Sequence, residues 1–155
     1  MILDDWQSFV KIDPSKMLDE IDRLPDQLAQ AWELGQAFDL PRWKDIDGVV
    51  IVGMGGSGIG ADLFQAFAAP LSEKPVQIWR NYDLPAFVSK RTLVILSSHS
   101  GNTEEILSAF ERALEIGAKA VAISTGGELS RLAGQHSVPL LRFVHAGQPR
   151  AAIGY

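Results

Sequence analysis

The sequence predicts an α/β fold: a three-layer αβα sandwich around a five-stranded parallel sheet, preceded by an N-terminal helical arm. Two observations lead to this prediction. From Gly48 onward the chain contains five short apolar runs rich in β-branched residues, which are typical of strands buried on both faces. Helical stretches separate most of these runs, and strands that alternate with such crossovers form right-handed βαβ units in a parallel sheet.

The arm occupies residues 1–47 and is expected to be helical. Asp13 and Pro14 supply an N-cap and the proline that is favoured at the first helical position, and apolar residues follow at helical spacing. Pro25 is expected to end or kink this helix, and a second amphipathic stretch runs to about Phe38. We expect these helices to pack on the domain or on a partner.

The domain at residues 48–155 is predicted to alternate strands and helices. The expected strands are Val49–Val52, Val76–Trp79, Thr92–Leu96, Ala120–Ile123 and Val138–Leu141. The expected helices are Ala61–Ala68, Glu104–Ile116 and Glu128–Ala133. Phe64, Phe67 and Phe110 lie on these helices, and we expect all three to pack in the core. In a doubly wound sheet of order 2-1-3-4-5, the first and third strands are neighbours at the switch point.

Composition and charge exclude several classes of function. The 155 residues contain no cysteine, which rules out disulfides, thiolate metal sites and cysteine nucleophiles. The net charge is −5, and 11 of the 19 acidic residues precede Gly48, so the chain lacks the basic face of a nucleic-acid binder. The start of the chain is acidic, and no apolar run approaches the ~18 residues of a membrane span. We therefore expect a cytoplasmic protein that binds neither nucleic acid nor membrane.

A glycine-rich segment, residues 53–60, follows the first strand directly. Glycines at this density let the backbone aim successive N–H groups at one anion, and the N-terminus of the next helix adds positive partial charge. Gly53, Gly55 and Gly58 also satisfy the G-x-G-x-x-G pattern of dinucleotide sites, but the acid expected at the end of the second strand is missing. Arg80 lies there instead and would suit a 2′-phosphate, so an NADP-binding domain remains an alternative.

A second polar loop, residues 97–103, follows the third strand. It holds four hydroxyl groups and one side-chain amide, and such groups donate to phosphate oxygens together with free backbone N–H groups. Asn102 with Glu105 also fits a capping box, in which the loop would only cap the next helix. Because the first and third strands are neighbours, we expect both loops to open into one crevice. Without a Walker lysine, they favour a sugar phosphate over a nucleoside triphosphate.

These motifs resemble the sugar isomerase (SIS) domain, which has the flavodoxin-like strand order 2-1-3-4-5. The resemblance rests on G-M-G-G-S-G at 53–58, S-x-S-G-N-T-x-E at 98–105, S-T-G-G at 124–127 and Q-P-R-A-A at 148–152. The last motif is similar to the N-terminal half of bifunctional phosphoglucose/phosphomannose isomerases. The resemblance implies an interconversion of glucose 6-phosphate or mannose 6-phosphate with fructose 6-phosphate through a cis-enediol, without metal or cofactor.

The resemblance also implies roles for individual residues. The positions that match the family's ligands for the substrate phosphate are Gly56, Ser57, Ser98, Ser100 and Thr103. The further candidate contacts are Gly55, His99 and Asn102. Arg150 matches the arginine that lies near C1 and C2 of the sugar and stabilises the enediolate. His99 departs from the family pattern, so the resemblance assigns it no chemistry.

The family's catalytic glutamate and its ring-opening histidine follow the P-R-A-A segment, and the sequence given stops at Tyr155. Glu104 and Glu105 open a helix, where carboxylates favour the helix dipole. His136 and His145 are expected to have structural roles. We therefore expect this chain to bind a sugar 6-phosphate and to turn it over poorly.

The segment from Pro149 to Tyr155 begins a helix that is too short to be stable alone. We expect the chain to be a fragment of a longer two-domain enzyme, or this segment to dock on another subunit. The expected partner is accordingly a second SIS half or a second copy in a homodimer. A stand-alone SIS module that senses a phosphosugar remains an alternative, although the sequence shows no helix-turn-helix.

Overall fold

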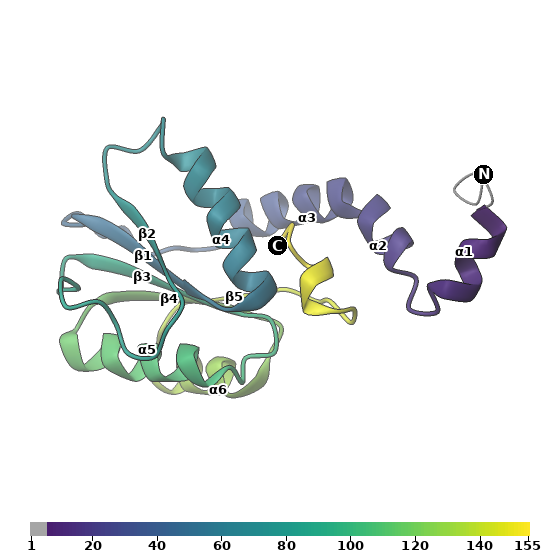
Figure 1. Ribbon diagram of the computed structural model, residues 1–155. Coiled ribbons are helices and arrows are strands. Elements are labelled where there is room, and N and C mark those ends of the chain that lie inside the picture. Colours follow the sequence, from purple (N-terminus) through teal and green to yellow (C-terminus); the bar gives the residue numbers. More distant parts are fainter. Residues whose placement is uncertain (1–5) are drawn as a thin grey trace.

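The sheet contains five parallel strands in the order β2-β1-β3-β4-β5, as predicted (Figure 1). The computed structural model describes residues 6–155, with the backbone alone at 6, 7 and 10, so the acidic start at 1–5 lies outside the described residues. The strands are β1 (Gly48–Gly53), β2 (Val76–Trp79), β3 (Thr92–Ser98), β4 (Lys119–Ser124) and β5 (Leu140–Arg142). All four neighbouring pairs run parallel.

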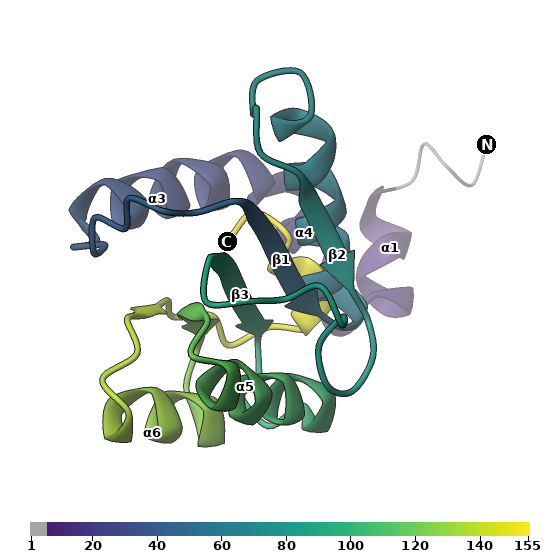
Figure 2. The same cartoon turned by 90° about the vertical axis from the view of Figure 1, so that its left-hand side faces the viewer.

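Helices lie on both sides of the sheet, which gives the three layers (Figures 1 and 2). The helices are α1 (Trp6–Ile12), α2 (Met17–Asp22), α3 (Leu24–Ala37), α4 (Gly55–Ala68), α5 (Glu104–Ile116) and α6 (Gly127–Gln135), with a short 3-10 helix at Pro149–Ala151. α5 and α6 cover one face, and α4 lies over the other together with the C-terminal segment. None of the helices within residues 6–155 is both long enough and apolar enough to cross a bilayer.

The core lies between the sheet and the helices α5 and α6. Alternate strand residues such as Val50 and Leu96 point to this side and are fully buried against Phe110 and its neighbours on α5. Phe110 is thus in the core, as predicted. The same prediction is wrong for Phe64 and Phe67, which are 48% and 69% exposed. α4 packs on the sheet through small residues instead, so its phenylalanines are left on the outer side.

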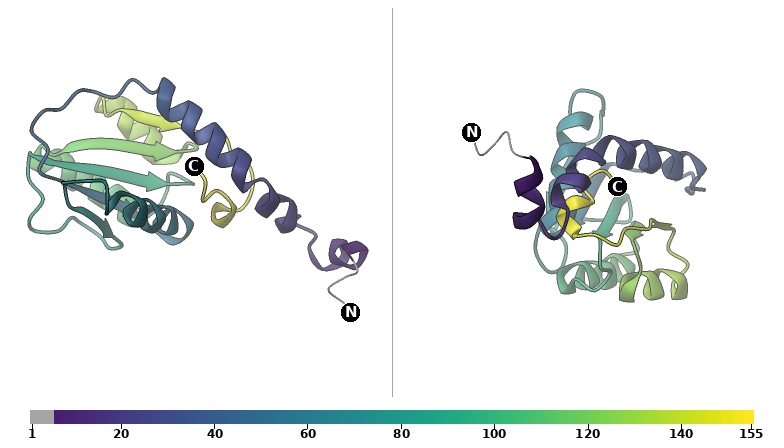
Figure 3. Two further views of the ribbon diagram at one scale, coloured as in Figure 1. Left: turned by 90° about the horizontal axis from the view of Figure 1, so that it is seen from above. Right: turned by 90° about the vertical axis from the view of Figure 1, so that its right-hand side faces the viewer.

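The described part of the N-terminal arm, residues 6–47, contains three helices, and α1 lies farthest from the sheet (Figure 3). The first predicted helix corresponds to α2 and starts later than expected, because Asp13 lies in the turn that precedes α2. Its carboxylate accepts the backbone N–H groups of Met17 and Leu18 at 2.8 and 2.9 Å. These two hydrogen bonds hold the pKa of Asp13 below its ordinary value. Pro25 lies in the first turn of α3, just after α2 has ended.

Helix α3 packs beside the C-terminal segment, as Figure 3 shows. Gln27, the buried residue of α3, donates from Nε2 to the carbonyl oxygen of Ala151 at 2.7 Å. The hydroxyl of Tyr155 donates to Oε1 of Gln30 at 2.6 Å. The residues after Pro149 are therefore covered by the arm on one side and by α4 on the other, and Ala151 and Ala152 are buried.

Candidate functional site

The carboxyl ends of β1, β3 and β4 meet at one edge of the sheet, and each is followed by the start of a helix. In the strand register Gly53 pairs with Ser97, and Ser98 pairs with Ser124. The segments after these residues lead into α4, α5 and α6. Three helix N-termini therefore lie along the same edge, which is where open α/β sheets bind ligands.

The glycine-rich segment forms the first turns of α4, so the predicted loop over residues 53–60 is wrong in extent. The positive φ of 51° at Gly55 turns the chain from β1 into the helix almost at once. Gly58 is the first helical residue whose N–H reaches back to Met54, at 3.2 Å, which leaves the three preceding N–H groups free within the helix. Ser57 lies in this turn and adds a hydroxyl to these donors.

Internal hydrogen bonds hold the serine loop, residues 97–103. Ser98 is only 2% exposed, and its Oγ accepts the N–H of Gly101 at 3.0 Å and pairs with Oγ1 of Thr103 at 2.9 Å. Oγ of Ser100 accepts the Asn102 N–H at 3.2 Å, but this serine lies on the exposed part of the loop. Ser98 therefore shapes the loop, whereas Ser100 keeps a hydroxyl accessible to a ligand.

The structure does not contain the capping box that was the alternative interpretation of Asn102. Its Oδ1 accepts the backbone N–H of Glu128 at 2.9 Å, so the side chain links the serine loop to the start of α6. The hydroxyl of Thr125 donates to the carbonyl oxygen of His99 at 2.7 Å. These two hydrogen bonds hold the serine loop against the segment between β4 and α6.

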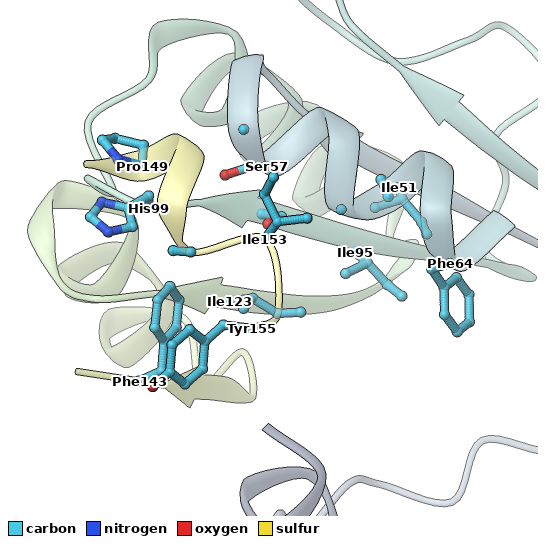
Figure 4. Close-up of a pocket in the computed structure, with 15 residues that line it drawn as sticks. Ile51, Ser57, Phe64, Ile95, His99, Ile123, Phe143, Pro149, Ile153 and Tyr155 are labelled. Atoms are coloured by element: carbon cyan, nitrogen blue, oxygen red, sulfur yellow. The ribbon is translucent and has the colours of Figure 1, made fainter. Parts of the chain in front are cut away.

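A cavity of about 250 Å³ opens between the sheet, the start of α4 and the C-terminal segment (Figure 4). Its polar lining comes from Ser57, Ser97 and His99, and its apolar lining includes Ile51, Ile95, Ile123, Phe143, Ile153 and Tyr155. The structure thus brings the start of α4 and the serine loop to one crevice. The remaining candidates on the serine loop, Ser98, Ser100, Asn102 and Thr103, lie outside the lining of this cavity.

Arg150 lies on the outer side of the same helix start. It is exposed on the 3-10 helix, and its Nη2 donates to Oε1 of Gln148 at 3.1 Å. Together with Gly55 and Arg80 it lines an open groove that the serine loop does not reach. Gly56 allows the 3-10 helix to pack against α4, because a Cβ there would lie 2.7 Å from the carbonyl oxygen of Pro149.

Arg80, the residue that would suit an NADP 2′-phosphate, is occupied by contacts within the chain. Its Nη2 donates to the carbonyl oxygen of Gly58 at 3.0 Å and forms an ion pair with Asp62. Both partners belong to α4. The guanidinium group therefore links the start of α4 to the end of β2.

The histidines His99 and His145 form a direct contact beside the cavity. Nε2 of His99 and Nδ1 of His145 are 2.9 Å apart, and Oε2 of Glu20 lies 3.5 Å from Nε2 of His145. Burial lowers the pKa of His99 below its ordinary value, and the neighbouring His145 lowers this pKa further. His136 is exposed at the end of α6.

Sequence reasoning included Ser97 only among the four hydroxyl groups of the polar loop, and it gave no role at the site to Phe143, Tyr155 and Glu20. The rings of Phe143 and Tyr155 are stacked with centroids 4.7 Å apart and form one wall of the cavity. Ser97 offered a signal, since it is the first residue of the polar loop. Glu20 and Tyr155 offered none, because only the packing of the arm and the C-terminal segment brings them here.

Three curated relatives align with most of the chain and with about a third to two fifths of their own length. The bifunctional phosphoglucose/phosphomannose isomerase of Caldicellulosiruptor bescii is 44% identical over 140 residues, which cover 90% of this chain and 41% of the relative. The protein of the same name from Thermoplasma acidophilum is 45% identical over 107 residues, covering 69% and 32%. The D-glucosamine-6-phosphate 4-epimerase of Sulfolobus acidocaldarius is 33% identical over 118 residues, covering 76% and 37%.

Solved structures share the fold, whereas no model of a known protein family matches the sequence. A candidate phosphosugar isomerase from Clostridium difficile superposes with a TM-score of 0.68 at 17% identity, covering 89% of this chain and 42% of that one. The NanR protein of Vibrio vulnificus, solved in complex with ManNAc-6P, superposes with a TM-score of 0.58 at 18% identity, covering 99% and 59%. This chain is therefore homologous to part of the bifunctional phosphoglucose/phosphomannose isomerases, shares the fold of the solved phosphosugar isomerase, and is consistent with an N-terminal sugar isomerase (SIS) half.

Proposed function

We propose that this chain holds the phosphate group of a hexose 6-phosphate for an aldose–ketose isomerase. The observation that carries the proposal is the meeting of Ser57 on α4 with the serine loop at one edge of the sheet. Free N–H groups and hydroxyls at this edge suit a phosphate dianion, because hydrogen bonds to a charged acceptor are the strong ones. The 44% identity to a phosphoglucose/phosphomannose isomerase supports this choice of substrate.

The proposed reaction interconverts glucose 6-phosphate or mannose 6-phosphate with fructose 6-phosphate through a cis-enediol. In this proposal Gly56, Ser57, Ser100 and Thr103 belong to the phosphate site. Arg150 stabilises the negative charge that develops on the enediolate, as a guanidinium aimed at a developing oxyanion does. Its exposed position near the start of α4 supports this role, because the sugar would extend from the phosphate toward it.

We further propose that the chain binds its ligand but turns it over poorly without a second SIS half or a partner copy. Isomerisation needs a base that moves a proton between C1 and C2. Among the described residues, those that line the cavity include no carboxylate. Glu104, at the start of α5, accepts the hydroxyl of Tyr82 at 3.0 Å and is not part of the lining.

Calorimetry with a panel of ligands tests the binding proposal. Fructose 6-phosphate should bind the chain, whereas fructose and NADPH should not. Ser100→Ala should weaken binding of fructose 6-phosphate by about 1.5–3 kcal/mol, the contribution of a hydrogen bond to a charged group. Ser15→Ala, in the turn between α1 and α2, is the matched control and should leave the affinity unchanged. Heat with NADPH alone would overturn the proposal in favour of a nucleotide site.

Turnover is measured separately by following the sugar products with NMR. Slow conversion of glucose 6-phosphate or mannose 6-phosphate to fructose 6-phosphate is expected, with faster conversion on addition of a second SIS half. Near-normal rates from this chain alone would contradict the incomplete-site proposal. Inversion at C4 would indicate an epimerase, and tight binding without any turnover in either state would favour a sensor of phosphosugars.

A further inference from the structure

The central strand β3 is buried more completely on one face of the sheet than on the other. Val94 and Leu96 are fully buried, whereas the alternate residues Leu93, Ile95 and Ser97 are only partly buried. Alternate strand residues point to opposite faces, so the partly buried set belongs to the face on which α4 lies. Parallel strands are ordinarily covered on both faces, and the described residues leave part of this face uncovered.

The uncovered area lies beside α4. Figure 2 shows α3 and α4 on one side of the sheet and α5 and α6 on the other. α4 packs mainly on β1 and β2, whereas the helices that pack on β4 are α5 and α6. The hydrogen bonds that α3 makes through Gln27 and Gln30 reach the C-terminal segment. The sheet between α3 and α4 is therefore the floor of the cavity in Figure 4.

This floor is apolar, and the cavity is polar only at one end. Ile51, Ile95 and Ile123 form what we call the isoleucine floor, and Phe64 of α4 stands beside it. Ile51 and Ile95 are paired in register, and Ile95 lies two residues before Ser97, which belongs to the polar end. Among the described residues, those that line the cavity include no Asp, Glu, Lys or Arg. Removing such a surface from water is favourable.

The width of the uncovered area matches one helix. An α-helix with its side chains is about 10 Å wide and strands lie about 4.8 Å apart, so one helix covers about two strands. Because α4 covers β1 and β2, room for one further helix remains over β3 and β4. Phe64 is 48% exposed although it lines the cavity, so its ring is available to a helix that packs there.

We propose that the isoleucine floor docks an amphipathic α-helix from the part of the relatives' length that this chain does not match. The chain covers 41% of the relative from Caldicellulosiruptor bescii, so more than half of that protein lies outside the matched region. The docked face carries apolar side chains at positions i, i+3 or i+4, and i+7, and the opposite face is polar. The inference goes beyond the proposed function, since it concerns the sheet behind the polar end of the cavity.

A small molecule fits this floor less well than a helix does. The cavity of about 250 Å³ is smaller than the range of about 300–1,000 Å³ that is typical of ligand pockets. Such pockets also place several polar groups around the ligand, whereas the isoleucine floor offers none. Side chains that project from a helix need only apolar contact, which the three isoleucines and Phe64 provide.

Isoleucine methyl NMR of the full chain tests the proposal. The probe is a peptide of about 20 residues, or 30 Å of helix, that follows the matched region in the Caldicellulosiruptor bescii relative. The methyl signals of Ile51, Ile95 and Ile123 should shift on binding. Those of Ile12 and Ile59, which are exposed outside the lining, should stay in place. A scrambled peptide of the same composition controls for unspecific apolar contact.

Two adjacent substitutions on α4 locate the contact. Phe64→Glu should weaken binding of the peptide at least 10-fold, because a charge buried against apolar groups is costly. Leu63→Glu is the matched control, since Leu63 is 58% exposed and lies outside the lining; it should change the affinity less than 3-fold. Both side chains are about half exposed, so both variants should keep the urea midpoint of the wild-type chain.

The outcomes are distinct from those of the proposed function. If the peptide shifts the floor methyls no more than the scrambled peptide does, or if Leu63→Glu weakens binding as much as Phe64→Glu, docking on the isoleucine floor is refuted. If the chain alone is a dimer by light scattering and Phe64→Glu makes it a monomer, a second copy is the occupant and the proposed helix is wrong. Binding of fructose 6-phosphate by the same samples would leave the phosphate proposal standing in each of these cases.

Discussion

The substitution Ser98→Ala tests the difference between a residue that shapes the serine loop and one that binds the ligand. Ser98 is 2% exposed, and its Oγ accepts the Gly101 N–H at 3.0 Å and pairs with the hydroxyl of Thr103 at 2.9 Å. Each such hydrogen bond contributes about 0.5–1.5 kcal/mol net, so the variant should lose about 1–3 kcal/mol of unfolding free energy. The Gly101 N–H retains a second acceptor, the carbonyl oxygen of Ser98 at 3.2 Å, which keeps the loss from being larger.

Ser100→Ala is the matched comparison because it alters the same loop at an exposed position. Its stability should change by no more than about 0.5 kcal/mol, as for other surface substitutions. Its affinity for fructose 6-phosphate should fall by about tenfold or more, since 1.4 kcal/mol corresponds to a factor of ten. Ser98→Ala should weaken binding only as far as the loop loosens.

Urea denaturation followed by circular dichroism gives the unfolding free energies, and calorimetry gives the affinities. The slopes of the denaturation curves should agree between variants, which shows that the change is one of stability. If Ser98→Ala unfolds at the wild-type urea concentration and binds as weakly as Ser100→Ala, Ser98 is a direct phosphate ligand. The assignment of Ser98 as a loop-shaping residue would then be wrong.

Two further substitutions and one change of pH test other contacts in the structure. Gly101→Ala should lose more than about 2 kcal/mol, because its Cβ would lie 1.9 Å from the carbonyl oxygen of Gly126 at a φ of 70°; a wild-type urea midpoint would contradict this packing. Gln27→Leu should lose about 1–3 kcal/mol in the same assay, because it leaves the buried Ala151 carbonyl without its donor at 2.7 Å; an unchanged midpoint would mean that the arm does not hold the C-terminal segment. The folded-state pKa of Asp13 is lowered, so its stabilisation of α2 is complete above the unfolded value of about 3.9 and is lost as the pH falls through the folded pKa; amide NMR shifts in α2 that do not change on acidification would refute this cap.

Much of the sheet could be predicted because its signals are local. The β-branched runs predict β1 to β4 within two residues at each end, and their alternation with helices predicts the parallel order. The start of α4 could not be predicted in this way, because glycine ordinarily disfavours a helix. Here the turn at Gly55 and the packing of Gly56 against Pro149 override that propensity.

The candidate site likewise has features that the sequence predicts and features that depend on tertiary packing. The sequence by itself determined the polar and glycine-rich residues that follow the strands, because parallel strands bring their carboxyl ends to one edge regardless of the rest of the fold. Only the tertiary structure decided that Ser98 is buried while Ser100 is exposed, and that Asn102 binds the start of α6. The meeting of Glu20, His145 and His99 was likewise decided by the packing of the arm on the C-terminal segment. Contacts between residues that are distant in the sequence depend on how whole elements pack, and no local pattern in the sequence encodes them.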